Sequence, residues 1–369
     1  MILSRLSLRN FRIHKNINFN FSETLNYIVG GNGQGKTSVL EAAYYLCTTK
    51  SFNSKDIEAV SFNDNEFEIN GLFNDITEDK IRVIFSVPEN RKYYFQNDKL
   101  ISRSSQIIGR FPVVILTPAD HAITQGSPAE RRKLIDSVIA QASSTYLEVL
   151  LDYNKTIKQR SVVLNRLREN FNKNTNTELE AWTEKLIANG VELIHHRIKF
   201  INVFNKYVID SYKKIIGEKE SPSIEYSFLN DCDEDQIKNT FLSLIKEKKE
   251  EEIRRGINLV GPHKDDFIFK INNVSLRTYG SQGQHKTFQT ALRFAEFFYL
   301  KETTGKTPIF LLDDVFGELD AYRAGKISEY LKEVGQAFIT LTDFADFSFL
   351  KKDKNDLIIK LENGSVTYA

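Results

Sequence analysis

The chain contains the glycine-rich run Gly30-Gly31-Asn32-Gly33-Gln34-Gly35-Lys36-Thr37, in which two glycines bracket four residues before Lys-Thr. An apolar segment at 25–29 precedes this run, and a helical pattern follows it from Lys36 to about Cys47. A strand, a glycine-rich turn and a helix in this order are typical of a phosphate-binding loop. A chance match in an ordinary glycine-rich turn is the alternative, and the flanking strand and helix argue against it.

Each residue type in the run suits the binding of phosphate. Glycines let the backbone wrap around phosphate groups so that amide N–H groups point inward, and the helix that begins at Lys36 adds its positive end. In such loops the Lys36 ammonium reaches the β and γ phosphates and the Thr37 hydroxyl ligates Mg²⁺. The predicted nucleotide-binding residues are Gly30, Gly31, Asn32, Gly33, Gln34, Gly35, Lys36, Thr37 and Ser38.

A second motif lies far along the chain, where the apolar run 309–312 is followed by Asp313 and Asp314. A strand that ends in two acids delivers a carboxylate to the carboxyl edge of a parallel sheet, where a phosphate loop also lies. We expect Asp313 to hold Mg²⁺ together with Thr37, and Asp314 to orient or polarise an attacking water. Many strands end in acids, so the argument depends on the phosphate loop being present as well.

A third motif, Tyr279-Gly280-Ser281-Gln282-Gly283-Gln284, stands just before the helical pattern 283–303. It resembles the signature motif of ABC-type ATPases, which contacts the γ-phosphate bound to a partner subunit. Ser281, Gly283 and Gln284 at a helix start suit an anion that comes from outside, although an ordinary turn and helix cap is the alternative. The resemblance implies that Ser281 acts catalytically in a second copy and that ATP drives dimerisation. Residues 318–320, Glu-Leu-Asp, resemble the D-loop of the same interface.

Further segments narrow the class of ATPase. They are Asn10-Phe11-Arg12, residues 126–136 (Gly-Ser-Pro-Ala-Glu-Arg-Arg-Lys-Leu-Ile-Asp), 158–160 (Lys-Gln-Arg) and 261–266 (Gly-Pro-His-Lys-Asp-Asp), together with 280–284. On these segments, and over nearly its whole length, the chain resembles the RecF family. The resemblance implies that Arg12 reaches the phosphates and that Arg131 and Arg132 are functional or bridge two lobes. Lys264 departs from the pattern, because RecF proteins typically carry Arg there, and Ile135 replaces a usual Leu.

Two further assignments follow from comparison with ABC transporters. Residues 340–343, Thr-Leu-Thr-Asp, stand where transporters have a switch histidine, so a γ-phosphate sensor there would have to be a threonine. The loop that carries a glutamine in transporters is expected near residues 117–121 of this chain.

The expected fold class is α/β, an ABC-type ATPase head of the P-loop class with an inserted α-helical lobe. Strand patterns occupy 2–8, 17–21, 25–29, 67–73, 81–87, 93–95 and 113–116, and long charged helical patterns begin after Pro128. Those helical patterns are 129–142, 146–171, 179–216 and 234–255, with a break at 172–176. The β/α alternation then returns. We therefore expect an ATPase lobe built from 1–125 and 256–369 and a helical lobe built from 126–255.

Composition excludes several classes of protein. Lys+Arg 50 against Asp+Glu 49 gives a formal net charge of +1, which neither supports nor excludes nucleic acid. Cys47 and Cys232 lie far apart without neighbouring ligands, which argues against a disulfide framework or a zinc site. No apolar run approaches the roughly 18–20 residues of a membrane helix, and residues 1–5 lack an apolar signal core. We expect a cytoplasmic protein without a membrane partner.

The RecF resemblance implies a DNA-repair and DNA-replication function connected with the SOS response. It implies a weak, DNA-stimulated ATPase that binds gapped DNA at double-strand/single-strand junctions and, with RecR and RecO, helps to load the recombinase RecA. A transporter subunit is the first alternative, but it predicts a fuller signature and a switch histidine. An SMC-like structural ATPase would need hundreds of coiled-coil residues. A phosphotransferase would leave residues 281–284 unexplained.

Overall fold

The computed structural model describes residues 1–169, 173–343 and 353–369, which fold into two compact units. Unit 1 comprises Met1–Asp120, Asp210–Lys219 and Lys286–Ala369, and unit 2 comprises His121–Ile209 and Glu220–His285. Residues 256–285, which the sequence places with the ATPase lobe, lie in unit 2. They do so because β10 (Asp266–Ile271) pairs with β9 (Pro222–Ser227) and not with a strand of unit 1.

Unit 1 contains two six-stranded sheets. Its strands are β1 Ile2–Phe11, β2 His14–Asn20, β3 Leu25–Val29, β4 Glu66–Asn74, β5 Glu78–Ser86, β6 Arg91–Gln96, β7 Lys99–Leu100, β8 Val113–Leu116, β12 Ile309–Leu312, β13 Ala337–Leu341, β14 Leu357–Glu362 and β15 Ser365–Tyr368. One sheet is antiparallel in the order β2-β1-β4-β5-β6-β7. The other has the order β15-β14-β3-β13-β12-β8, parallel except for β15.

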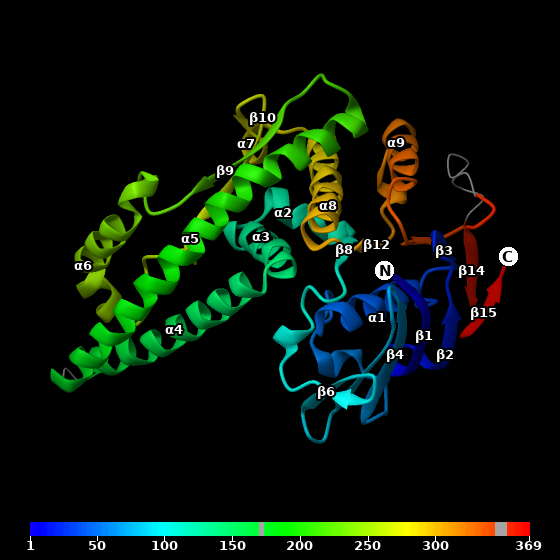
Figure 1. The fold of residues 1–369 in the computed structure, drawn as a ribbon, viewed down its shortest axis with the longest axis horizontal. Coiled ribbons are helices and arrows are strands. Elements are labelled where there is room, and N and C mark those ends of the chain that lie inside the picture. Colours follow the sequence, from blue (N-terminus) through cyan, green and yellow to red (C-terminus); the bar gives the residue numbers. More distant parts are fainter. Residues whose placement is uncertain (170–172, 344–352) are drawn as a thin grey trace. The chain divides into compact units, whose positions relative to one another are not determined.

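Helix α1 (Lys36–Thr48) packs between the two sheets of unit 1, beside β1 and β4 (Figure 1). Leu40 and Leu46 of this helix share one apolar core with residues of both sheets, such as Phe67 and Leu311. Because α1 begins directly after the glycine-rich run, this core fixes the end of the run in space. The burial of α1 therefore determines where the loop's backbone amides point.

The other face of the parallel sheet is covered by α9 (Ala321–Leu331) and by the part of α8 (Gln282–Thr304) that belongs to unit 1. Phe294 of α8 packs edge-to-face on Phe310 of β12, with ring centroids 5.0 Å apart, and stacks on Tyr330 of α9 at 4.1 Å. Short 3-10 helices in this unit are Asp56–Ala59, Ser104–Gln106, Pro118–Asp120 and Phe316–Glu318.

Unit 2 is mainly helical, and a three-stranded sheet in the order β11-β10-β9 packs on its helices. Its elements are α2 His121–Gln125, α3 Pro128–Ala142, α4 Ser144–Glu169, most of α5 Lys173–Ile216, β9, a 3-10 helix at Glu234–Gln236, α6 Ile237–Arg255, β10, β11 Val274–Ser275 and α7 Leu276–Tyr279. The break expected at 172–176 falls partly outside the described residues, and α5 already begins at Lys173.

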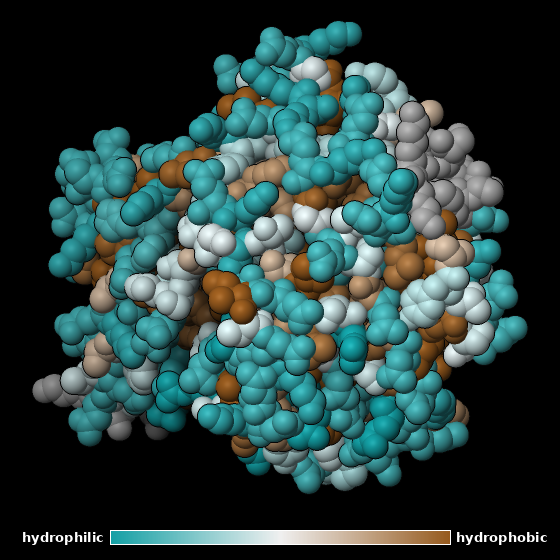
Figure 2. All heavy atoms as spheres, turned by 45° about the vertical axis from the view of Figure 1, so that its right-hand side comes forward, coloured by the Kyte–Doolittle hydropathy of each residue, from teal (hydrophilic) through white to brown (hydrophobic). Residues whose placement is uncertain are grey.

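The surface in the space-filling view is dominated by hydrophilic side chains, among which apolar ones occur in small groups (Figure 2). Large apolar side chains that are exposed include Phe62, Ile76 and Tyr279. Scattered exposure of this kind is usual for a folded domain and needs no partner to explain it. Over 1–169, 173–343 and 353–369, no helix is both long enough and apolar enough to cross a membrane.

Candidate nucleotide site

The glycine-rich run connects the end of β3 to the start of α1 in unit 1. Gly33 and Gly35 have φ angles of 79° and 87°, the left-handed region that glycine adopts without strain. Gly30 is required for a different reason, because a Cβ there would lie 2.5 Å from the Leu361 carbonyl oxygen. The run therefore follows a tight path against its neighbours.

Lys36 lies across this loop and is almost fully buried. Its Nζ donates hydrogen bonds to the carbonyl oxygens of Gly30 at 2.6 Å and Gly31 at 3.0 Å. Burial lowers the pKa of Lys36, and the charges of Asp314 and Asp313 oppose that change. The residue thus presents an ammonium group at the position where phosphate oxygens need a cation.

The acidic strand end lies beside the phosphate loop, because β12 and β3 both flank β13 in parallel and their carboxyl ends meet at one edge of the sheet. The Thr37 hydroxyl donates to Asp313 Oδ1 at 2.9 Å, which joins two motifs that are far apart in sequence. Burial raises the pKa of Asp313, and the hydrogen bonds from Thr37 and Thr340 oppose the rise. A threonine hydroxyl beside a carboxylate is the oxygen donor set that Mg²⁺ prefers.

Thr340 was not predicted to support the acidic strand end, yet it supports both acids. Its hydroxyl, buried in β13, donates to Asp313 Oδ1 at 2.9 Å and accepts the Asp314 amide N–H at 2.8 Å. Asp314 is exposed and has a φ of 49°, a left-handed conformation that costs a non-glycine residue energy. The chain therefore turns sharply after Asp313, and Thr340 stabilises that turn.

Replacing Thr340 with valine, which has nearly the same shape, is expected to lower the free energy of unfolding by about 1–3 kcal/mol. The variant leaves the Asp314 amide without its acceptor and removes a donor from the buried Asp313 carboxylate. Chemical denaturation measures the change. Thr340→Ser keeps the hydroxyl and should retain most of the stability. Equal losses in the two variants would contradict the role given to the hydroxyl.

Arg12 lies at the turn between β1 and β2, where it contacts α1. Its guanidinium forms a two-point ion pair with the buried Glu41, with Nε–Oε2 at 2.8 Å and Nη2–Oε1 at 2.6 Å. It also donates to Ser54 Oγ and to the Glu58 carbonyl oxygen. In this structure Arg12 therefore ties the β1–β2 turn to the helix that follows the phosphate loop.

The signature segment lies in unit 2, while the phosphate loop lies in unit 1. Ser281 and Gln284 form a reciprocal cap, in which Ser281 N donates to Gln284 Oε1 at 2.8 Å and Gln284 N donates to Ser281 Oγ at 3.2 Å. Gln284 Nε2 also donates to Glu220 Oε1 at 2.8 Å. Ser281 is exposed, and Gly283 is half-buried. The exposed start of α8 can accept an anion from solvent or from another molecule.

The D-loop segment lies in unit 1, as do residues 117–120 of the expected glutamine loop. Asp320 caps α9 by accepting the Arg323 N–H at 3.0 Å, and the Arg323 side chain donates to Thr287 of α8 at 2.8 Å. At the end of β8, Asp120 pairs with Arg293 of α8, with Nε–Oδ2 at 2.7 Å. Both segments are thus anchored to α8, the helix that the signature segment begins.

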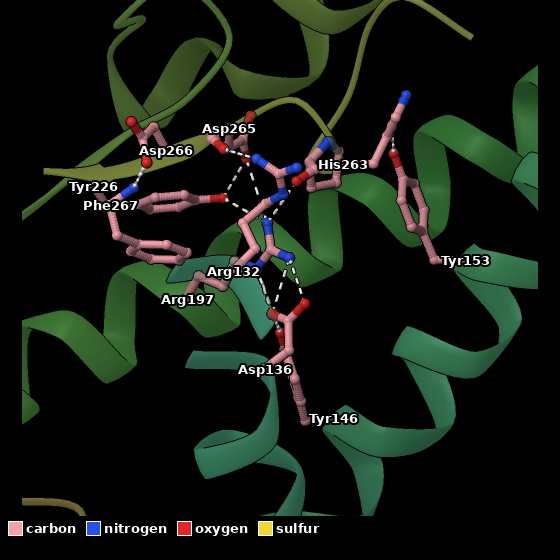
Figure 3. Close-up of polar contacts among 11 residues, drawn as sticks. Arg132, Asp136, Tyr146, Tyr153, Arg197, Tyr226, His263, Asp265, Asp266 and Phe267 are labelled. Atoms are coloured by element: carbon pink, nitrogen blue, oxygen red, sulfur yellow. Dashed lines mark hydrogen bonds and ion pairs between the residues drawn. The ribbon is translucent and has the colours of Figure 1, made fainter. Parts of the chain in front are cut away.

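Two segments of the RecF resemblance, 126–136 and 261–266, meet inside unit 2 (Figure 3). Arg131 is buried and holds Asp266 at two points, with Nε–Oδ1 at 2.7 Å and Nη2–Oδ2 at 2.9 Å. Arg132 donates to the Asp265 carbonyl oxygen at 2.5 Å. Buried Arg160 likewise pairs with Glu252 at 2.6 Å. These contacts join α3 to the start of β10, and α4 to α6.

Sequence reasoning missed two other contacts of the phosphate loop. His14 Nε2 lies 3.1 Å from the Gly35 carbonyl oxygen. Gln34 Oε1 accepts a hydrogen bond, 2.8 Å long, from the amide N–H of Asn363, which lies in the β14–β15 turn. The second contact joins residues that are far apart in sequence, and no spacing rule predicts it. His14 lies two residues after Asn10-Phe11-Arg12, so its closeness to that segment in the sequence was the available signal.

Comparisons with known proteins find relatives over nearly the whole chain. The family model described as "RecF/RecN/SMC N terminal domain" matches residues 2–364. A "DNA replication and repair protein RecF" from Salinibacter ruber is 38% identical over 350 residues, 93% of this chain and 85% of the relative. The protein of the same name from Chloroherpeton thalassium is 40% identical over 362 residues, 95% and 98% of the two chains.

Solved structures give the same result. The "recombination mediator protein RecF-ATPrS in RecFOR pathway" superposes with a TM-score of 0.90 at 31% identity and covers 100% of this chain and 98% of its own. An Smc head domain from Pyrococcus furiosus reaches a TM-score of 0.57 at 16% identity, covering 100% and 95% of the two chains, which shows a shared fold. The predicted α/β ABC-type ATPase head is confirmed.

Proposed function

Because the chain belongs to the RecF family of DNA replication and repair proteins, we propose that ATP binding pairs two copies of it around DNA, and that weak hydrolysis separates them. As a RecF-type recombination-repair ATPase, the chain has an ATP-binding ABC-type fold. The observation that carries the proposal is the meeting of Lys36, Thr37 and Asp313 at one edge of the parallel sheet. That constellation fits a nucleoside triphosphate with Mg²⁺.

Each residue at the sheet edge has a distinct part in the proposed chemistry. Lys36 and the loop amides bind the phosphate oxygens and stabilise the negative charge that develops on them. Thr37 and Asp313 would hold Mg²⁺, which supplies further charge neutralisation when bound. Asp314, exposed after the sharp turn, orients a water and accepts its proton at the carboxylate. Arg12, through Glu41, keeps the β1–β2 turn against α1, the helix that follows the loop.

The proposal divides each active site between two copies of the chain. Ser281, Gly283 and Gln284 of one copy complete the phosphate site of the other, because the exposed start of α8 places the Ser281 hydroxyl and the positive end of the helix at the surface. Because this part of the nucleotide site exists only in the dimer, the dimerisation equilibrium shifts toward the dimer as nucleotide concentration rises. ATP should therefore favour dimers more strongly than ADP.

For DNA we propose backbone-directed binding at double-strand/single-strand junctions of gapped DNA. Support comes from the name of the solved relative, a "recombination mediator protein" of the "RecFOR pathway". Partners of the RecR and RecO kind, acting together to load RecA, belong to the same proposal. Contacts to phosphate rather than to bases make such binding steeply dependent on salt. Because the formal net charge is only +1, the positive charge that binds DNA must be concentrated on one part of the surface.

Exchanging Ser281 for arginine is expected to weaken ATP-dependent dimerisation at least tenfold, because a bulky side chain then occupies the face that should accept a second copy's phosphate. Sedimentation velocity with a slowly hydrolysed ATP analogue, and separately with ADP, measures the dimer fraction. Asn239→Arg, on the exposed side of α6 in the same unit, is the control for added charge and size. A Ser281→Arg chain that dimerises as wild type does would refute the divided site.

DNA specificity is tested on the wild-type chain. ATP turnover should rise when gapped DNA is added at low salt, and the stimulation should exceed that given by plain duplex and fall as salt increases. Turnover that ignores DNA at low salt would rule out the DNA part of the proposal while leaving ATP binding intact.

A further inference from the structure

We propose that His14 is a positioning residue of the phosphate loop: its ring Nε2–H holds the Gly35 carbonyl so that the Lys36 amide faces bound phosphate. The inference rests on the proposed nucleotide function and adds to it a residue outside the glycine-rich run. Three observations support it, namely the burial of the ring, its hydrogen bond to the loop and its fit against Gly35.

His14 is held firmly by the antiparallel sheet of unit 1. It is the first residue of β2 and pairs with Phe11 of β1 across the turn. The residue is 2% exposed, and its ring packs edge-to-face on Phe19, with centroids 6.4 Å apart. A buried ring on a paired strand has little rotational freedom, so its Nε2 atom lies at a defined position.

The hydrogen bond has a definite direction. Nε2 of His14 lies 3.1 Å from the Gly35 carbonyl oxygen, and a carbonyl oxygen only accepts, so the proton is on Nε2. Burial lowers the pKa of His14, and the bond to Gly35 opposes that change. The imidazole is therefore neutral near pH 7, and its single N–H is committed to the loop.

The fit against Gly35 is close enough to exclude any side chain there. A Cβ on Gly35 would lie 2.4 Å from His14 Nε2 and 2.7 Å from its Cε1, and Gly35 has a φ of 87°. Glycine is thus needed at this position both for its backbone conformation and to admit the imidazole. The β1–β2 turn and the phosphate loop have complementary shapes at this point.

The bond acts on phosphate through one rigid peptide unit. The Gly35 carbonyl and the Lys36 N–H belong to the same planar amide, so fixing the oxygen fixes the direction of the N–H. The hydrogen bond from His14 to the Gly35 carbonyl also polarises this amide, so the Lys36 N–H becomes a stronger hydrogen-bond donor. Gly35 is the N-cap of α1, where backbone N–H groups have no partner within the helix. His14 thereby prepares the amide of Lys36 for an anion.

The test compares donor-free and donor-bearing variants of His14 for binding of ADP, ATP and adenosine. His14→Phe keeps a ring but lacks a donor, and should weaken ADP and ATP binding by about threefold to tenfold, the effect of one hydrogen bond. His14→Gln carries an amide N–H and should restore most of the loss. Adenosine, which has no phosphate, should bind all variants alike. His14→Leu is a second donor-free variant if the phenylalanine variant does not fold.

Phe19→Leu is the matched control, because it disturbs the packing around the His14 ring without touching the loop. Thermal unfolding without nucleotide reports the general damage of each variant. The inference is overturned if a folded donor-free variant binds ADP as wild type does, if Gln fails to restore binding, or if Phe19→Leu has an equal effect. A wild type that binds neither nucleotide would instead overturn the proposed function.

Discussion

Turnover of ATP by the Lys36→Ala variant is expected to fall by two orders of magnitude or more, since one preorganised charge-stabilising group typically contributes roughly 100- to 1,000-fold. Alanine removes the ammonium that lies 2.6 Å and 3.0 Å from the carbonyl oxygens of Gly30 and Gly31, at the point where the triphosphate should bind. Phosphate release under saturating ATP, with and without gapped DNA, measures the effect. Nucleotide affinity should fall as well, because in the proposed site Lys36 would contact the phosphates both before and during hydrolysis.

The control for this variant is Lys50→Ala, which removes an exposed lysine just beyond the same helix. Its turnover should match wild type. The thermal midpoint of Lys36→Ala should stay near that of wild type, because Lys36 contacts loop carbonyls and contributes little to the apolar core. A Lys36→Ala chain that hydrolyses ATP at the wild-type rate would show that turnover arises elsewhere.

The largest loss of stability is expected from Arg197→Met, about 3–5 kcal/mol in the free energy of unfolding. Arg197 is buried at the centre of a network in unit 2 (Figure 3). Its Nη2 contacts both Asp136 oxygens at 2.9 Å and 3.0 Å, its Nη1 lies 3.6 Å from Asp265 Oδ2, and the Tyr226 hydroxyl also donates to Asp265. Methionine fills similar space but leaves the buried Asp265 carboxylate without its cation.

The loss should depend on pH in a defined direction. Burial raises the pKa of Asp265 from 3.8 to about 6, and Arg197 opposes that rise. A carboxyl whose pKa is higher in the folded state stabilises the fold most at low pH, and this contribution is lost as pH rises through the folded pKa. Removing Arg197 raises the pKa of Asp265 further. The loss of unfolding free energy in Arg197→Met should therefore be smaller near pH 5, where Asp265 is largely protonated, than near pH 8.

Chemical denaturation at the two pH values measures this dependence. Arg166→Met is the control, because Arg166 and Glu178 form an exposed pair at 3.4 Å in the same unit. Exposed pairs contribute little, so the stability of that variant should change by less than about 1 kcal/mol at either pH. A deficit of Arg197→Met that is equal at both pH values, or no greater than that of Arg166→Met, would contradict the account of the network.

The core of the candidate site was predictable because its chemistry lies in short segments. Glycines at 30, 33 and 35 fix the loop, and an apolar strand that ends in Asp313 can deliver that acid to the same sheet edge in an α/β fold. The 2.9 Å contact between Thr37 and Asp313 confirms this meeting of the two motifs. The strands 25–29 and 113–116 were predicted with the bounds that the structure shows.

The parts that were missed depend on contacts between distant segments. Thr340 supports Asp313 and Asp314 from the neighbouring strand β13, and its residue type alone gives no sign of that partner. The strand β9 (Pro222–Ser227) was not predicted, although Ile224 and Tyr226 alternate with more exposed residues, because charged helical patterns surround it. Its pairing with β10 places residues 256–285 in unit 2.

The most direct test of the divided active site is to mix two variants, Lys36→Ala and Ser281→Arg, each expected to be inactive alone. A mixed dimer would join the intact phosphate loop of the Ser281→Arg chain to the intact signature of the Lys36→Ala chain. At protein and ATP concentrations high enough for both variants to pair at random, half of the dimers are mixed and each holds one working site, so turnover should recover toward about a quarter of the wild-type rate. A rate that stays at the sum of the two separate variants would contradict a site shared between two copies.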